Sequence, residues 1–132
     1  MKIEKVSITR DDVELLLTME GGGFDYWAQI TYGEDDYRTT KERMKKNNVK
    51  PEFDGRYCYE QVLAYMICDT EYPVYVYDFE EDVKHLLTKN RIEHGFLLNA
   101  QNRPEDASLD DGDAETGDCI LQYAVFGDIV YG

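Results

Sequence analysis

Alternation of apolar and polar positions predicts two β-strands along the chain, and residue types predict a third segment that is either a strand or an irregular segment packed on the sheet. Residues 2–8 place Ile and Val on one side of an extended segment, and residues 24–32 are rich in aromatic and β-branched side chains. The clearest pattern is the run 74–79, Val-Tyr-Val-Tyr-Asp-Phe, which three consecutive acids at 80–82 bring to an end. We expect the run 74–79 to lie inside the sheet.

Other segments carry their apolar residues at helical spacing. Thr9 is placed to cap a first helix that ends at Gly21-Gly22-Gly23, because a threonine side chain can accept from the free N–H groups of the first turn. Residues 57–69 predict a second helix. Thr88 is placed to cap another, which stops before Pro104.

The last apolar run, residues 119–126, is apolar on nearly every side and therefore predicts the most buried helix. Asp113 or Asp118 is a candidate cap for it, and Gly127 marks its end. The charged segment 33–50 has little apolar periodicity, so we expect an exposed basic excursion there, which can be helical.

These elements define an α+β fold. A chain of 132 residues has the length of one domain, and such a domain buries roughly two-thirds of the surface of its unfolded chain. We expect residues 1–132 to form a single domain, with a mixed or antiparallel sheet of about three to four strands packed with about three to four helices.

The charge of the chain is strongly negative and unevenly placed. Fourteen basic against 28 acidic residues give a net charge of −14, which repels nucleic acid and anionic membranes. Residues 38–50 hold six bases and one acid, whereas the chain from Pro104 onward has eight acids and no base. We expect an exposed acidic loop at 104–118, and no direct binding of nucleic acid or membrane.

The location of the protein is also indicated by its apolar pattern. No apolar run approaches the roughly 20 residues that a membrane span needs, and the first residues lack the pattern of a secretory signal. We expect a cytoplasmic protein in which Cys58, Cys68 and Cys119 are reduced thiols. The sequence is also compatible with a homo-oligomer.

The sequence matches none of the common motifs for metals, cofactors or nucleophiles. The acids of 104–118 do not follow the spacing of a calcium loop, and His85 and His94 are nine residues apart, on different faces of any helix. Gly21-Gly22-Gly23 follows a helix instead of opening one, so it is not a phosphate-binding loop. We predict no metal, no cofactor and no enzymatic activity.

Four aromatic residues are candidates for a ligand pocket. If residues 26 and 27 are extended, one of the rings of Tyr26 and Trp27 points inward and the other can reach a partner, although burial of both is the simpler alternative. Tyr75 and Tyr77 share one face of the strand 74–79. That face could be a structural layer, or a platform on which a nucleotide base stacks.

Two segments resemble a known group of proteins. Residues 20–27, EGGGFDYW, and residues 113–132, DAETGDCILQYAVFGDIVYG, are similar to small proteins encoded by phages and prophages of Firmicutes. In that group a GG…YW element follows the first helix and a DAD…IIQYALFGEIVFG-like element closes the chain. The resemblance implies a phage origin and a role against a host defence system, and it supplies no catalytic residues.

Three functions remain as hypotheses. The first is a non-enzymatic inhibitor of a bacterial anti-phage defence, similar in its action to an anti-CRISPR protein, that binds a host defence protein electrostatically. The second is sequestration of a nucleotide by Tyr26, Trp27, Tyr75 and Tyr77, and the third is a structural phage protein. For the first, the predicted contact residues are the acids of the C-terminal tract: Glu105, Asp106, Asp110, Asp111, Asp113, Glu115 and Asp118.

Overall fold

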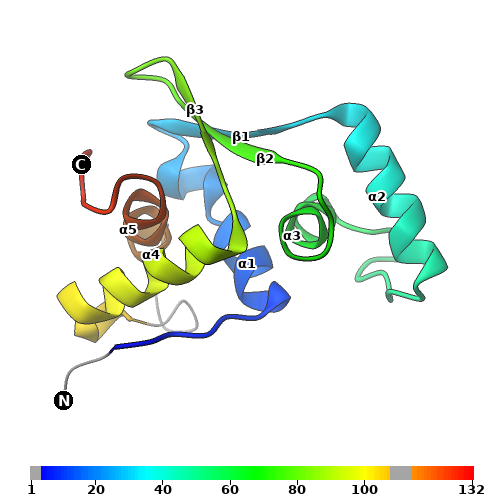
Figure 1. Ribbon diagram of the computed structural model, residues 1–132, viewed down its shortest axis with the longest axis horizontal. Coiled ribbons are helices and arrows are strands. Elements are labelled where there is room, and N and C mark those ends of the chain that lie inside the picture. Colours follow the sequence, from blue (N-terminus) through cyan, green and yellow to red (C-terminus); the bar gives the residue numbers. More distant parts are fainter. Residues whose placement is uncertain (1–3, 108–113) are drawn as a thin grey trace.

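The computed structural model describes residues 4–107 and 114–132 and confirms the α+β class. A three-stranded antiparallel sheet packs with helices (Figure 1). The described residues hold five α-helices, since the charged segment also folds as one. In chain order the elements are α1 (Arg10–Leu17), the π-helical turn η1 (Glu20–Phe24), β1 (Ala28–Tyr32), α2 (Glu34–Lys46), α3 (Tyr59–Asp69), β2 (Val74–Asp78), β3 (Val83–Leu86), α4 (Lys89–Asn102), the 3-10 turn η2 (Pro104–Asp106) and α5 (Ala114–Phe126).

The sheet has the order β1-β2-β3, so the predicted strand at 74–79 is its central strand. Ala28 lies opposite Asp78 in the first pair of strands, and Tyr75 lies opposite Leu86 in the second. Val74, Val76 and Asp78 are buried on the inner face of β2. Helices α1, α3, α4 and α5 lie on one side of the sheet in Figure 1, and Tyr75 and Tyr77 lie half-buried on the other face.

Helix α5 is buried along most of its length, as its apolar sequence predicts. Every residue from Thr116 to Ala124 is buried, and α4 packs directly against it. Gly95 of α4 permits this approach, because a Cβ atom there would lie 2.5 Å from the carbonyl oxygen of Ile120. Gly117 has the same role toward η1, since its Cβ would lie 2.7 Å from the Cβ of Met19.

Two helix caps occur where the sequence predicts them. The Thr9 hydroxyl accepts from the N–H of Asp12, and the Asp12 carboxylate accepts from the N–H of Thr9. The Thr88 hydroxyl accepts from the N–H of Arg91 at the start of α4. Each cap satisfies N–H groups that the first turn of a helix leaves without an intrahelical acceptor.

Helix α2 lies at the side of the molecule, beyond α3 (Figure 1). Met44 is buried against Val62 and Tyr65 of α3 in a small second cluster. Arg43 donates two hydrogen bonds to the Glu71 carboxylate, at 2.9 and 3.0 Å. Most of the excursion predicted at 33–50 is therefore a helix docked by one face, with most of its other charges exposed.

Some predicted elements are wrong. The described part of the segment 2–8 pairs with no strand; instead its apolar side chains pack against the core, and Ile8 is buried. Helix α1 ends at Leu17, before the glycines, and Gly22 has a φ of +85° inside the turn η1. The strand β3 was not predicted, because the sequence VKHL lacks a run of β-branched residues.

The predicted acidic loop at 104–118 is also wrong over its last part. Residues 114–118 form the first turns of α5, so Asp118 lies inside the helix and does not cap it. Asp113, the other candidate cap, lies outside the described residues. Gly127, with a φ of +74°, follows the last turn of α5 as expected. Within the described residues, none of the helices has the length and apolar character needed to span a membrane.

Candidate functional site

A hollow of about 610 Å³ opens at the end of the molecule where α5, the segment 127–132 and the turn before β1 meet. We call it the C-terminal hollow. Its walls come from three parts of the chain that are distant in sequence. It is lined by Tyr26, Glu115, Asp118, Cys119, Gln122, Ile129, Tyr131 and Gly132.

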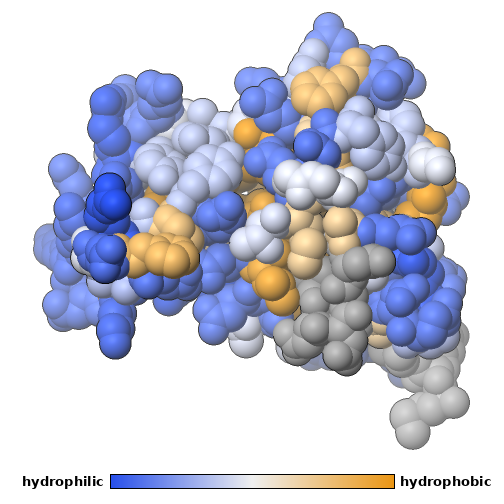
Figure 2. Space-filling model, turned by 180° about the vertical axis from the view of Figure 1, so that it is seen from behind, coloured by the Kyte–Doolittle hydropathy of each residue, from blue (hydrophilic) through white to orange (hydrophobic). Residues whose placement is uncertain are grey.

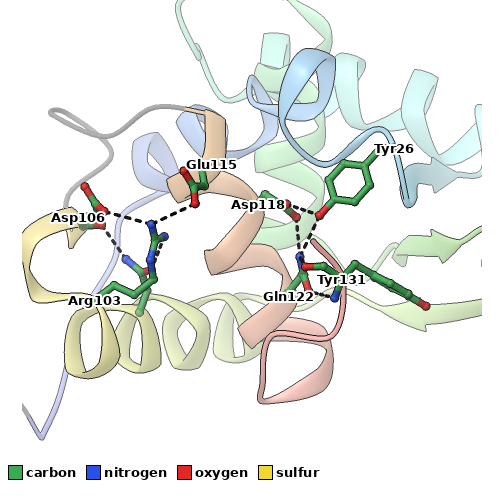
Figure 3. A network of polar contacts seen from close by, with 8 residues as sticks. Tyr26, Arg103, Asp106, Glu115, Asp118, Gln122 and Tyr131 are labelled. Carbon is green, nitrogen blue, oxygen red and sulfur yellow. Dashed lines mark hydrogen bonds and ion pairs between the residues drawn. The ribbon is translucent and has the colours of Figure 1, made fainter.

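Asp118 forms the fixed polar base of this hollow. Its carboxylate accepts from the Tyr26 hydroxyl at 2.6 Å and from the Trp27 indole N–H at 2.7 Å. The Gln122 amide, one helical turn further along α5, donates a third hydrogen bond at 3.0 Å. These three hydrogen bonds hold the buried side chain in one orientation; Figure 3 shows those from Tyr26 and Gln122.

Gln122 links the network to the segment 127–132. Its side-chain oxygen accepts from the N–H groups of Val130 and Tyr131, both at 2.8 Å. Its amide nitrogen donates to the carbonyl of Tyr131 at 3.1 Å. Figure 3 shows how Gln122 lies between Asp118 and this segment. One buried glutamine therefore positions the backbone that forms one wall of the hollow.

Tyr131 anchors the same segment on the sheet. Its hydroxyl donates to the buried carboxylate of Asp78, with oxygen distances of 2.8 and 3.0 Å. Burial, followed by this hydrogen bond, raises the pKa of Tyr131 to about 12, so the hydroxyl remains a donor. The Trp27 ring packs on both Tyr131 and Phe126, with ring centres 5.3 Å apart in each case.

The exposed groups of the C-terminal hollow are aromatic, apolar and acidic. Tyr26 is 51% exposed, although burial of its hydroxyl and the bond to Asp118 raise its pKa well above the usual value. The Glu115 side chain is 74% exposed at the rim. None of the described residues that line the hollow is a lysine, an arginine or a histidine. The arrangement suits a cation with apolar character, which can contact an aromatic ring and a carboxylate together.

A second network lies beside the hollow and joins α4 to α5. The Arg103 guanidinium donates to the Asp106 carboxylate at 3.1 Å and lies 3.8 Å from the Glu115 carboxylate (Figure 3). The side-chain amide of Asn99, a buried residue, donates to the carbonyl of Asp106 at 2.8 Å. Arg103 is the last basic residue in the sequence, and its ion pairs neutralise part of the negative charge of the C-terminal segment.

The predicted acidic contact residues thus have different environments. Glu105 and Glu115 are exposed, Asp106 is half-buried and paired with Arg103, and Asp118 is buried. Asp118 is therefore not an exposed acid of a charged loop: its buried carboxylate accepts from Tyr26, Trp27 and Gln122 and lines the C-terminal hollow. Asp110, Asp111 and Asp113 lie outside the described residues.

The four predicted ligand-binding aromatics do not come together. Trp27 is fully buried, with its indole N–H on Asp118 and its ring against Phe126 and Tyr131. On the outer face of the sheet, Tyr77 packs against Phe79 and donates to Asp82, and Tyr75 lies under the Lys84 ammonium at 5.5 Å. Tyr26 and Trp27 do point to different environments as one alternative predicted, although both lie in a turn and not in a strand.

A separate cluster joins α1, the loop before α3 and the start of α3. The Cys58 sulfur lies 3.5 Å from a Glu52 oxygen and 3.8 Å from a Glu14 oxygen, and we call these three residues the thiol-carboxylate cluster. Burial is the main cause that raises the pKa of the Cys58 thiol to about 11. Burial also raises the pKa of Cys68 to about 11. Neither thiol is therefore activated for nucleophilic chemistry.

The raised pKa of Glu14 makes the stability of the protein depend on pH. Burial, then the hydrogen bond and charge of Glu52 and the charge of Asp11, raise its pKa from 4.5 to about 7. Arg10 also faces the space beside it. Because the folded state binds the Glu14 proton more tightly than the unfolded state, stability falls as pH rises from about 4.5 to about 7.

We therefore expect the variant Glu14→Gln to be more stable than the wild type at pH 8 and to differ little from it at pH 4.5. Urea unfolding at both pH values, in the presence of a chelator, measures this difference. The control is Glu34→Gln, which removes an exposed carboxylate in α2. An equal effect of the Glu14 substitution at both pH values would contradict the assigned cause.

Sequence reasoning missed the main partners of both sites. Tyr131 carried no signal, because its role depends on the return of the chain past α5, and the partners of Gln122 in the segment 127–132 could not be identified for the same reason. Glu14, Glu52 and Cys58 belong to three elements, and no spacing rule connects them. The one available signal was the Tyr26-Trp27 pair, whose polar ring atoms need partners when the rings are packed.

Comparison with known proteins gives no further guide to the site: no protein-family model, curated protein or solved structure matches this chain. Geometry and charge are therefore the guides to its function.

Proposed function

We propose that this protein is a non-enzymatic binding protein that recognises a positively charged partner protein through the C-terminal hollow. The observation that carries the proposal is the composition of the hollow: an exposed tyrosine ring, a fixed buried carboxylate and a rim glutamate that is 74% exposed and only loosely paired with Arg103, 3.8 Å away. None of the described residues that line the hollow is a base. An arginine or lysine side chain of a partner fits such a site, because its stem packs on apolar surface while its charge meets carboxylates.

The charge of the whole molecule supports the same partner. Arginines that could neutralise the surface already form ion pairs with acids of the same chain, as Arg10 does with Asp69 and Arg43 with Glu71. A net charge of −14 attracts a basic partner over a distance and so accelerates encounter. Apolar surface on the face in Figure 2 lies in small separate patches among hydrophilic residues. Electrostatic recognition is consistent with both features.

The partner class that we propose is a bacterial anti-phage defence protein with a basic, nucleic-acid-binding groove. Its support is the resemblance of residues 20–27 and 113–132 to phage-encoded proteins, together with the negative charge. Occupation of such a groove would block the defence protein without any chemistry, in the cytoplasm of the bacterial host. In this account the C-terminal hollow receives one basic side chain of the groove, and the surrounding acids contribute long-range attraction.

The test uses a fluorescent arginine-rich peptide and measures its affinity by anisotropy at low and moderate salt. Tyr26→Ala removes the exposed ring. We expect it to weaken binding by about tenfold, because the cation–π contact that is lost contributes about 1 to 2 kcal/mol. Glu115→Gln is expected to weaken binding roughly threefold. Glu34→Gln is the matched control, since it removes the same charge from α2 and leaves the hollow unchanged.

Equal affinities of the Glu115 and Glu34 variants would show that the peptide responds only to net charge and would contradict the site. The same pair of variants, compared in a pull-down from bacterial lysate, identifies partners that depend on the hollow. A partner captured equally by wild type and Tyr26→Ala does not use it.

A further inference from the structure

The thiol-carboxylate cluster brings together three side chains whose ligand atoms are close enough to bind one metal ion. Its oxygen and sulfur atoms all lie within 4.8 Å of one another, with sulfur-to-oxygen distances of 3.5 and 3.8 Å. A tetrahedral zinc ion, with bonds of about 2.3 Å to sulfur and about 2.1 Å to oxygen, holds such atoms about 3.6 Å apart. The two observed sulfur-to-oxygen distances are therefore close to those of a zinc coordination sphere.

Gln61 provides a second and independent sign of a ligand. It is only 9% exposed, and with Glu14 and Glu52 it lines a small cavity of about 40 Å³. Its amide nitrogen donates to the carbonyl of Lys50 at 2.9 Å, which leaves the amide oxygen for another partner. That oxygen is buried and has no hydrogen-bond partner among the described residues. A buried amide oxygen without a donor is costly, and a cation in this cavity would satisfy it.

We propose that Glu14, Glu52 and Cys58 bind a zinc-class divalent cation beside the small cavity that Gln61 lines together with Glu14 and Glu52. The ion would connect α1, the loop before α3 and the first turns of α3. It would also replace the repulsion between two adjacent carboxylates by attraction to one positive centre.

The ligand set selects the class of metal. A cysteine sulfur is a soft ligand that zinc accepts and that calcium and magnesium do not use, since these bind oxygen. Charges around the cluster favour a cation, because Asp11 and Glu60 line the adjoining hollow. Arg10, the base that faces the cavity, is paired with Asp69 at 2.7 Å and packs on the Tyr65 ring.

Cobalt(II) is the probe for the test, because it occupies zinc sites and its bond to a thiolate gives a charge-transfer absorption. The full chain is freed of metal with a chelator and titrated with cobalt(II), and zinc is then added to displace it. We expect a saturable signal at one equivalent, displacement by zinc, and a rise in melting temperature on zinc addition.

Matched cysteine variants make the result specific. Cys58→Ser is expected to lose the charge-transfer signal, whereas Cys68→Ser, which changes the thiol near the other end of α3, should retain it. Glu52→Gln and Gln61→Leu keep the thiol and should weaken cobalt binding by at least about tenfold. Circular dichroism of each variant shows whether it is folded, and Glu52 is exposed enough to tolerate the change.

Two results would overturn the proposal. The first is a signal that survives Cys58→Ser or disappears in Cys68→Ser, because a different thiol would then bind the metal. The second is the absence of saturable binding to the folded wild type, in which case the cavity holds water alone. Neither result affects the proposed recognition of a basic partner, whose residues are separate.

Discussion

Replacement of Gly95 by alanine is expected to destabilise the protein by about 2 kcal/mol and to lower its melting temperature by roughly 6–10 °C. The added Cβ atom would lie 2.5 Å from the carbonyl oxygen of Ile120 and 2.9 Å from the Cβ of Ala124. Such overlap costs roughly 3 kcal/mol, and the higher helix propensity of alanine recovers about 1 kcal/mol of it. Thermal unfolding followed by circular dichroism measures the change.

Gly21→Ala is the matched control for this prediction. Gly21 has a φ of −72°, and a Cβ atom added there would meet no atom within 4 Å. The same substitution at this position should therefore alter stability by less than about 0.5 kcal/mol. A Gly95→Ala protein as stable as the control would show that α4 and α5 are not packed this closely.

Loss of the Asp118 carboxylate should have the second large effect. Asp118→Ala leaves the buried N–H of Trp27 without its acceptor and releases the Gln122 amide, so we expect a loss of about 3 kcal/mol. Asp118→Asn retains one acceptor oxygen and should cost less. Urea unfolding followed by the fluorescence of Trp27, the single tryptophan, gives the shift of the midpoint.

Glu115→Gln is the control for the Asp118 variants. This glutamate lies one turn earlier on α5, and its side chain is 74% exposed. Its replacement should change stability by less than about 0.5 kcal/mol. If Asp118→Ala is equally mild, water or another group satisfies Trp27, and the carboxylate does not organise the hollow.

Local sequence signals predicted much of the fold. Thr9 and Thr88 cap helices because a cap depends on atoms within three residues, and the strand at 74–79 follows from its own alternation. The short strand β3 depends instead on pairing with β2 through a hairpin. The segment 2–8 alternates like a strand, but in its described part, residues 4–8, Val6 and Ile8 pack on the core without a strand partner.

The candidate site could be predicted only in part, because its contacts join distant residues. Charge counting placed Asp118 on the surface with the neighbouring acids, yet it bonds to Trp27 across 91 positions of sequence. An apolar helix in which one acid and one glutamine are four residues apart suggests a polar network within the core. The sequence cannot show which elements return to complete that network.

The central claim is that the C-terminal hollow receives a positive group, and a nitrogen-15 NMR titration with an arginine-rich peptide tests it most directly. Trp27 provides the single indole N–H signal of the chain, and its proton is bonded to Asp118. We predict saturable shifts of this signal and of the backbone amides of Tyr26, Val130 and Tyr131. Shifts spread evenly over the exposed acids, or confined to α1 and α2, would contradict the account.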